Sequence, residues 1–399
     1  MQQLRKKKRF WFKMSILMAR AILQKILITF CRLVPRNKRI WIFGSRDGQH
    51  YDENSKALFE YVNERALTIR PIWLTRNKVI YNHIKEKGYE VYYTSSFYGC
   101  IYSLIAGVAV ISVSLEDVNK RLSYGTRVIQ LWHGTPLRNN DISYIGEDYD
   151  AVILAAEEFL TTQKMSEKRN FNYVLSGYPG NDNLFSTHKT EKIERLKLHY
   201  QFDKMVLYAP THRERLFPDG KKVWMLEFDM FSSYGFNFEQ LEDVMRRTRS
   251  LFVLKLHPVQ KISDKNLQDR INKSKFVHLV DSGDPLLDVY DYLLHTDVLV
   301  TDYSSAYFNF LLLNRPIIFA AFDYESQLMI RSMRFPYEEV TPGPKAKNWT
   351  ELCEWLDMII QGRDDWVKWR QIVNQRFNAY RDGGSCERVY DQIRKLTGV

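Results

Sequence analysis

Two histidines that follow apolar runs are the first candidates for acid–base chemistry. His133 lies in Trp132-His-Gly-Thr-Pro136, and His257 lies in Leu254-Lys-Leu-His-Pro258. A neutral imidazole can take a proton from a hydroxyl near pH 7. The structural alternative is a histidine that bonds a neighbouring carbonyl and has no chemical role. Because His133 stands at a strand end inside Trp132-His-Gly-Thr-Pro136, we favour the chemical role for it. We expect His257, at another strand end, to contact a ligand or to be a cation beside a phosphate.

Two further strand ends carry groups that suit a phosphate. The run Val298-Leu-Val-Thr-Asp-Tyr-Ser-Ser305 leads into a helix-like pattern, where backbone N–H groups and hydroxyls can bind an anion. Arg213 ends another run and offers a planar fork that matches phosphate oxygens. The structural alternatives are a helix cap for the serines and an ion pair for Arg213. Asn309 lies one turn into the helix-like pattern.

The sequence lacks the motifs of several common enzyme classes. The chain has no close Asp-x-Asp pair, and Asp281 and Asp284 fit a turn and a helix start better than a metal site. It has no Gly-x-Gly-x-x-Gly turn, no Gly-Lys-Ser/Thr loop and no Gly-x-Ser-x-Gly elbow. We therefore expect no metal and no cofactor, and the dinucleotide oxidoreductase, P-loop NTPase and esterase classes lose support.

The elements that must position these residues alternate between strands and helices from Arg39 onward. A first series of expected strands covers 39–45, 69–75, 89–94, 107–114, 126–132, 150–156 and 172–176. A second series covers 205–209, 252–256, 276–280, 297–301 and 316–320. This rhythm predicts parallel strands with crossover helices. We expect two α/β doubly wound domains that face each other across a cleft, with ligands beyond the carboxyl ends of the strands.

The charge of the chain is concentrated at one end. Residues 1–39 hold twelve of the 58 Lys and Arg residues and no Asp or Glu, which leaves 46 basic against 47 acidic residues elsewhere. The net charge of +11 therefore does not predict nucleic-acid binding by the body of the protein. The four cysteines are far apart and lack metal-ligand spacing, which indicates a reducing compartment.

Residues 10–34 have the pattern of a basic amphipathic helix. Lys13, Arg20 and Gln24 share one side, and large apolar residues fill the rest. No charge-free run approaches the ~18 residues of a membrane span. We expect residues 1–38 to lie on an anionic membrane surface, and the alternative is a helix that packs on the body or on another subunit.

Four blocks, taken in their order and spacing, resemble the CDP-glycerol glycerophosphotransferases of teichoic-acid and capsule synthesis. The blocks are Trp132-His-Gly-Thr-Pro136, Tyr208-Ala-Pro-Thr-His-Arg213, Leu254-Lys-Leu-His-Pro258 and Thr301-Asp-Tyr-Ser-Ser-Ala-Tyr-Phe-Asn-Phe310. The resemblance covers roughly residues 39–390 and implies a GT-B-like pair of Rossmann-type domains. We expect a membrane-associating region at 1–38, an acceptor-side domain at 39–185 and a CDP-donor-binding domain with C-terminal helices at 186–399.

The resemblance also implies a reaction and a set of site residues. Glycerol phosphate would pass from CDP-glycerol to a hydroxyl of a polyprenyl-diphosphate-linked saccharide or a growing polyol-phosphate chain, with CMP released and no metal needed. His133 would be the base, and a protonated His257 would help to neutralise the diphosphate. Where the family usually has Asp, this chain has Asn309. The implied donor contacts are Trp132, His133, Gly134, Thr135, Pro136, Arg213, His257, Ser304, Ser305 and Asn309.

Other functions stay open at this point. The donor could be CDP-ribitol, or the chain could be a nucleotide-sugar glycosyltransferase of the same fold. From another class, it could be a membrane-bound scaffold without turnover. We expect a peripheral protein on the cytoplasmic face of the cell membrane. The sequence leaves open whether it forms a homo-oligomer and whether it adds one unit or many.

Overall fold

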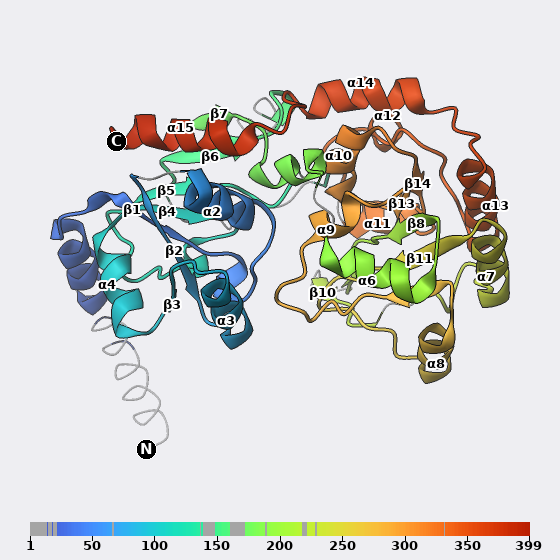
Figure 1. The fold of residues 1–399 in the computed structure, drawn as a ribbon, viewed down its shortest axis with the longest axis horizontal. Coiled ribbons are helices and arrows are strands. Elements are labelled where there is room, and N and C mark those ends of the chain that lie inside the picture. The colour runs from blue at the N-terminus through green and yellow to red at the C-terminus, as the bar shows by residue number, and fades with distance from the viewer. Residues whose placement is uncertain are drawn as a thin grey trace, which may run out of the picture.

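The computed structural model describes residues 14, 18, 22–65, 68–135, 137–138, 148–159, 172–187, 190–217, 222–227, 230–330 and 332–399. Two parallel sheets with helices packed against them make up the described chain (Figure 1). This confirms the α/β class predicted from the alternation of strands and helices.

The first sheet has seven parallel strands in the order β3-β2-β1-β4-β5-β6-β7. Its central strand β4 is buried along its whole length, as expected for a parallel sheet covered on both faces. The chain order reverses between β1 and β4, the place where doubly wound sheets bind ligands. The strands are β1 (Asn37–Phe43), β2 (Arg70–Thr75), β3 (Val91–Tyr93), β4 (Ala106–Ile111), β5 (Arg127–Gln130), β6 (Ala151–Leu154) and β7 (Tyr173–Leu175).

The second sheet repeats this winding with five parallel strands in the order β12-β11-β8-β13-β14. Its reversal lies between β8 and β13. Each predicted strand of both series overlaps an observed one. The strands are β8 (Lys204–Tyr208), β11 (Ser250–Leu254), β12 (Val277–Leu279), β13 (Val298–Thr301) and β14 (Ile317–Phe319).

Helices and short 3-10 turns connect the strands. The helix between β12 and β13 is short, since α9 covers only Val289–Leu293. An antiparallel hairpin, β9 (Glu214–Leu216) with β10 (Lys222–Trp224), was not predicted. The helices are α2 (Glu53–Arg65), α3 (Lys78–Glu86), α4 (Phe97–Ile105), α6 (Glu191–Tyr200), α7 (Phe238–Arg247), α8 (Lys265–Lys273), α9, α10 (Ala306–Phe310), α11 (Tyr324–Ile330), α12 (Tyr337–Val340), α13 (Trp349–Ile360), α14 (Val367–Phe377) and α15 (Ser385–Thr397), with 3-10 turns η1 (Arg46–Gly48), η2 (Leu115–Asp117), η4 (Pro179–Phe185) and η5 (Leu311–Leu313).

The last helix, α15, packs on the first sheet and not on the second (Figure 1). Its residues Cys386, Val389 and Ile393 join the same buried cluster as Trp41 and Phe59. The expected region 186–399 therefore does not describe the packing of α15, because an amphipathic helix pattern does not say which sheet it will cover. We call residues 37–185 with α15 the first body, and residues 191–377 the second body.

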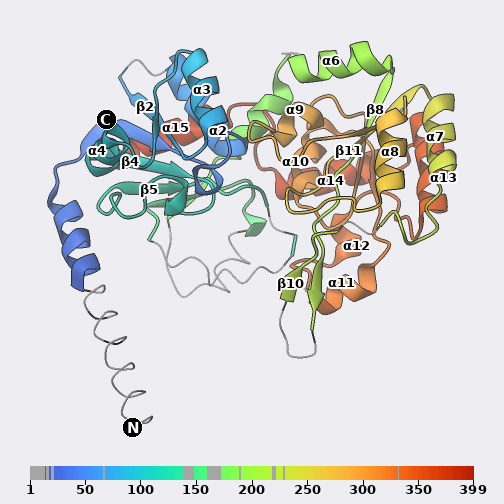
Figure 2. The same ribbon diagram turned by 90° about the horizontal axis from the view of Figure 1, so that it is seen from below.

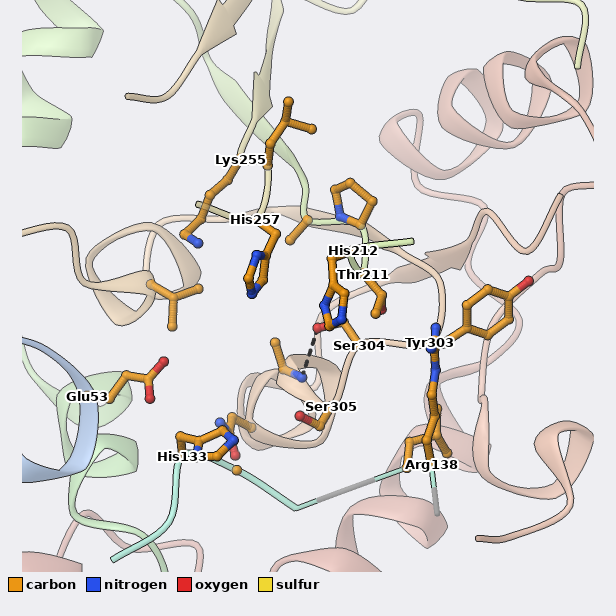
Figure 3. A pocket seen from close by; sticks show the side chains of 18 of the residues that line it. Glu53, His133, Arg138, Thr211, His212, Lys255, His257, Tyr303, Ser304 and Ser305 are labelled. Carbon is orange, nitrogen blue, oxygen red and sulfur yellow. Dashed lines mark hydrogen bonds between the residues drawn. The ribbon is translucent and has the colours of Figure 1, made fainter. Parts of the chain in front are cut away.

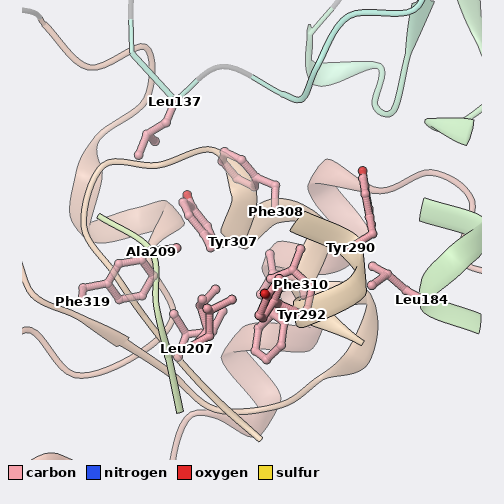
Figure 4. Close-up of a cluster of buried hydrophobic side chains, with 14 of the residues drawn as sticks. Leu137, Leu184, Leu207, Ala209, Tyr290, Tyr292, Tyr307, Phe308, Phe310 and Phe319 are labelled. Carbon is pink, nitrogen blue, oxygen red and sulfur yellow. The ribbon is translucent and has the colours of Figure 1, made fainter. Parts of the chain in front are cut away.

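The loop after β5 belongs to the first body and packs against the second body. Leu137, which follows the His133 motif, is buried in the apolar cluster of the second body (Figure 4). Its carbonyl accepts a hydrogen bond of 2.9 Å from the Arg334 backbone N–H. The loop that carries His133 is thus held from both sides.

Residues 22–33 form a helix that extends away from the first body (Figure 2). Its base is anchored, because Cys31 is buried and Arg36 donates to the Ser103 carbonyl at 2.9 Å. Beyond the base its apolar side chains are exposed, for instance Leu23 at 65%. Within the described residues, none of the helices has the length and apolar character needed to span a bilayer. Binding of this helix to a membrane surface stays a prediction.

Candidate functional site

A cavity of about 320 Å³ lies between the two bodies, at the carboxyl ends of both sheets (Figure 3). Loops after β1, β5, β8, β11 and β13 form it, in the place expected for doubly wound folds. Its polar lining comprises Arg46, Glu53, His133, Arg138, Thr211, His212, Lys255, His257, Tyr290, Tyr303, Ser304, Ser305 and Asn309. Six of the ten predicted contacts therefore meet here: His133, Gly134, His257, Ser304, Ser305 and Asn309.

One ring nitrogen of His133 faces a backbone carbonyl, which leaves the other ring nitrogen available for proton transfer. Nδ1 lies 3.4 Å from the Ser112 carbonyl oxygen, which can only accept a hydrogen bond. Nδ1 is therefore the N–H of the neutral ring, and Nε2 has the lone pair that can take a proton. Loss of hydration in the cleft lowers the pKa of His133 below its ordinary value of 6.5, and the charge of Arg46 lowers it further.

Gly134 brings the His133 loop against the serine pair of the second body. Its φ of +137° suits glycine, and an added Cβ would lie 3.3 Å from the Ser305 Oγ. Ser305 makes no capping hydrogen bond to α10. Ser304 Oγ accepts a long hydrogen bond of 3.4 Å from the Ala306 N–H. Capping thus accounts for little of what these hydroxyls can do, and both line the cavity.

His257 has the complementary tautomer. Its Nδ1 accepts a hydrogen bond of 3.4 Å from the Val259 N–H, so the neutral ring carries its proton on Nε2. Burial lowers the pKa of His257 to about 3, helped by His212, Arg46 and Lys255. The lowered pKa disfavours the protonated His257 expected from the sequence, because burial favours the neutral ring. A neutral His257 serves as a hydrogen-bond donor.

Arg213 does not line this cavity, and its donors are already used. Nε and Nη2 donate to Asp323 at 2.7 and 3.1 Å, and Nη1 donates to Asp302 at 2.7 Å and to the Thr211 carbonyl at 2.6 Å. The remaining Nη2 donor faces the Met230 sulfur at 3.9 Å. With its five N–H groups directed at these partners, Arg213 positions the strand ends and has no fork to offer a phosphate. The structural alternative given for Arg213 from the sequence is the observed one.

Asn309 is buried at 5% exposure and has a fixed orientation. Its Nδ2 donates to the Tyr290 Oη at 3.0 Å, and that hydroxyl donates to Asn181 Oδ1 at 3.0 Å. The Oδ1 of Asn309 has no hydrogen-bond partner in the part of the chain that the structure describes. This acceptor belongs to the cavity lining.

Two other predicted contacts, Trp132 and Thr135, do not line the cavity. Trp132 has a φ of +58° and packs, partly buried, against the core of the first body, and Thr135 is buried beside Tyr178. Pro136 lies outside the described residues. Trp132 shapes the turn that presents His133, because its strained backbone directs the next residue toward the cleft.

Sequence analysis missed most of the cavity's charged groups. Lys255 stands two residues before His257 inside a block that was already singled out, so its position was available from the sequence. Burial lowers the pKa of the Lys255 ammonium, which Glu53 counteracts. Arg46 follows the first strand, a common ligand position in doubly wound folds, and the Arg138 guanidinium lies 5.0 Å from the Tyr303 ring centre.

Within the described residues, no three His, Cys, Asp or Glu side chains are grouped so that they could hold a metal ion. The cations that line the cavity are those of arginine and lysine side chains. The arrangement can therefore bind a diphosphate with side-chain cations and hydroxyls, and it offers a base and a hydrogen-bond donor at one place.

Comparison with known proteins connects this geometry to a family. The family model for CDP-Glycerol:Poly(glycerophosphate) glycerophosphotransferase matches residues 26–395. The chain is 28% identical to a teichoic acid glycerol-phosphate transferase of Staphylococcus aureus over 90% of this chain and 94% of that protein. It is 25% identical to a teichoic acid poly(glycerol phosphate) polymerase of Bacillus spizizenii, over 92% and 95% of the two chains.

Solved structures show the same fold. The wall teichoic acid polymerase TagF aligns with a TM-score of 0.71 at 21% identity, over 97% of both chains. A variant of TagF soaked with CDPG aligns with a TM-score of 0.69 at 19% identity, again over 97% of both chains.

Proposed function

The chain belongs to the CDP-glycerol:poly(glycerophosphate) glycerophosphotransferase family, and on that premise we propose that it transfers glycerol phosphate from CDP-glycerol to a polymer or its primer. The attacking group is a hydroxyl of a polyprenyl-diphosphate-linked saccharide or of a growing polyol-phosphate chain, in teichoic acid or capsule synthesis. CMP is the second product. The relatives' names and the CDPG soak of TagF support this choice of donor.

The donor diphosphate binds to the second body. Lys255 supplies positive charge, Ser304 and Ser305 supply hydroxyl donors, and His257 donates its Nε2–H. Hydrogen bonds to a charged group are among the stronger ones in proteins. Because these cations and donors stabilise the developing charge, we propose that transfer needs no metal ion and keeps its rate in EDTA.

His133 acts as the base. The acceptor hydroxyl gives its proton to Nε2 as its oxygen forms a bond to the phosphorus that carries glycerol. The bond from that phosphorus to the bridging oxygen breaks, and CMP leaves with the bridging oxygen and its negative charge. The Ser112 carbonyl stabilises the imidazolium that results, through the hydrogen on Nδ1.

One observation carries this proposal: the two neutral histidines have opposite tautomers and line one cavity beside a lysine. The test is nucleotide release (CMP from the CDP donors, UDP from the UDP-sugar) and product mass after incubation with CDP-glycerol, CDP-ribitol or a UDP-sugar and a lipid-linked disaccharide. We expect a mass gain of one or more glycerol phosphate units with CDP-glycerol. Product with CDP-ribitol or the UDP-sugar alone would reassign the donor, and no product with any donor would favour a scaffold.

We also propose that the protein works as a peripheral protein on the cytoplasmic face of the membrane, where a lipid-linked acceptor is at hand. The exposed apolar side chains of helix 22–33 and the basic residues of 1–38 support it, and the free cysteines suit a reducing compartment. Deletion of residues 1–36 should abolish co-sedimentation with anionic vesicles. A variant with Ile22, Ile26 and Phe30 changed to serine separates the apolar from the charge contribution, and unchanged sedimentation of both would refute the proposal.

A further inference from the structure

Glu53 is a cavity residue that the donor chemistry above does not use. It begins α2 in the first body and reaches into the cavity, as does Lys255 from the second body (Figure 3). Its Oε1 accepts a hydrogen bond of 2.5 Å from Arg46 Nη2. Its Oε2 is buried and accepts no hydrogen bond from the part of the chain described here. A hydrogen-bond donor on a ligand would satisfy that oxygen.

The backbone of Glu53 is in a costly conformation. Its φ is +52°, in the left-handed region that non-glycine residues rarely adopt. Such a conformation destabilises the fold, and residues of this kind cluster at functional sites. Arg46, its ion-pair partner, has a φ of +44°. Two strained residues therefore hold one charged pair at the cavity wall.

The charge at this wall is unsuited to a diphosphate. Arg46 lies between two carboxylates, with its Nε 2.9 Å from Asp52 and its Nη2 bonded to Glu53. The three groups carry a net charge of −1 when all are ionised, which repels phosphate and attracts the hydrogen of a neutral hydroxyl. The opposite wall has Lys255 and the serine hydroxyls. The two walls thus suit two different ligands.

We propose that Glu53 binds a hydroxyl group of the acceptor, which donates a hydrogen bond to Oε2, and that it thereby selects and positions the acceptor in the cleft. This inference rests on the proposed function, because it takes the diphosphate donor to lie against the second body. The acceptor class is a polyol or saccharide end that carries a free hydroxyl.

The test compares Glu53→Gln and Glu53→Ala with the wild type and with Glu64→Gln, a change on the exposed side of the same helix. Initial rates are measured at varied concentrations of a lipid-linked disaccharide, and the Kd of the donor nucleotide is measured by calorimetry. We expect kcat/KM for the acceptor to fall about 10- to 100-fold in both Glu53 variants, the range for a hydrogen bond to a charged group. The donor Kd and the Glu64→Gln kinetics should stay within twofold.

A pH profile supplies a readout that a structural role would not move. Burial raises the pKa of Glu53 to about 7, against the lowering effect of Arg46. The charged groups around Glu53 are Arg46, Asp52 and Asp288, with Lys255 across the cavity. Because the carboxylate is the better hydrogen-bond acceptor, kcat/KM for the acceptor should rise through about pH 7 in the wild type. The Glu53→Gln variant should lack that rise.

Two results would overturn the inference. A donor Kd weakened as much as kcat/KM would mean that Glu53 acts on the donor through Arg46. Unchanged acceptor kinetics in Glu53→Gln would mean that no hydroxyl binds there. Failure of the proposed function is seen separately, in the wild type alone, as no CMP release with CDP-glycerol. If the wild type uses another donor, the same comparison is made with that donor.

Discussion

The two walls of the cleft differ in how their side chains are held. On the second body, Asp302 and Asp323 fix Arg213, and that buried network ties together the ends of β8 and β13. On the first body, the wall includes two residues in strained backbone conformations, Arg46 and Glu53, and a third such residue, Trp132, lies behind it. The second wall presents hydroxyls and Lys255, and the first presents a base and a carboxylate.

The difference shows how one cavity can serve two substrates. A wall whose strand ends are locked by a satisfied ion network suits a donor that must be held in one geometry. A wall that carries a titratable carboxylate in a strained backbone suits the proposed recognition of an acceptor hydroxyl. The following variants break one wall at a time.

Replacing the base should give the largest effect. His133→Ala should lower kcat about 10²- to 10⁴-fold, because it removes proton transfer from the attacking hydroxyl. CMP release gives the rate, and thermal unfolding should change little because the ring lines the cavity and its contact with the Ser112 carbonyl is long, at 3.4 Å. His199→Ala, on the exposed face of α6, is the matched control. Near-normal turnover by His133→Ala would remove this residue from the chemistry.

Breaking the buried ion network of the second wall should lower the free energy of unfolding more than breaking an exposed ion pair does. Arg213→Met leaves Asp302 and Asp323 buried without their partner, which costs about 3–5 kcal/mol of the free energy of unfolding. Arg195→Met is the control, because its pair with Glu191 is exposed and such pairs contribute about 0–1 kcal/mol. Urea unfolding measures both. Equal losses in the two variants would contradict the role assigned to the network.

A single hydroxyl of the second wall should matter for the donor alone. Ser305→Ala should weaken CDP-glycerol binding about tenfold, at the low end for a hydrogen bond to a charged group. Stability should not change, since Ser305 makes no capping bond. Ser304→Ala should add a slight loss of stability through its bond from Ala306. If Ser305→Ala changed the KM of the acceptor instead, the assignment of the walls would have to be exchanged.

A further effect is a pH dependence of stability. His257 titrates at about 3 when folded and near its ordinary 6.5 when unfolded, so the unfolded chain binds more protons between these values. Acidification from pH 6.5 toward 3 should therefore lower the free energy of unfolding. His257→Gln should show a smaller drop in the urea midpoint between pH 7 and pH 5. An identical drop in both proteins would mean that folding does not lower the pKa of His257.

The sequence predicted which strand ends form this site better than it predicted the ion pairs and charge states of the side chains there. Strand ends could be located from apolar runs, and they led to His133, His257 and the serine pair. The ion pairs of Arg213 could not be predicted, since its partners Asp302 and Asp323 are 89 and 110 residues away in the chain. Only the folded second sheet brings them together.

Local sequence patterns also do not predict how deeply a side chain is buried or which charged groups lie beside it. The charge state of His257 depends on burial and on Lys255 and His212, which no spacing rule reports. Glu53 begins an ordinary amphipathic helix, and nothing in that pattern indicates a left-handed backbone. The hairpin β9–β10 lacks a long apolar alternation, so it gave no strand signal.

The return of α15 to the first body affects how the protein is made. Asp182 accepts hydrogen bonds from the Ser385 and Cys386 N–H groups, and Tyr390 packs against Trp41 with ring centres 5.6 Å apart. A ribosome finishes residues 37–185 long before it reaches these contacts. Part of the apolar surface of the first sheet therefore stays uncovered until the second body and then α15 have been synthesised. Chaperones that bind nascent chains would meet this surface first, and truncation at residue 384 should yield a chain that aggregates although its cleft residues are all present.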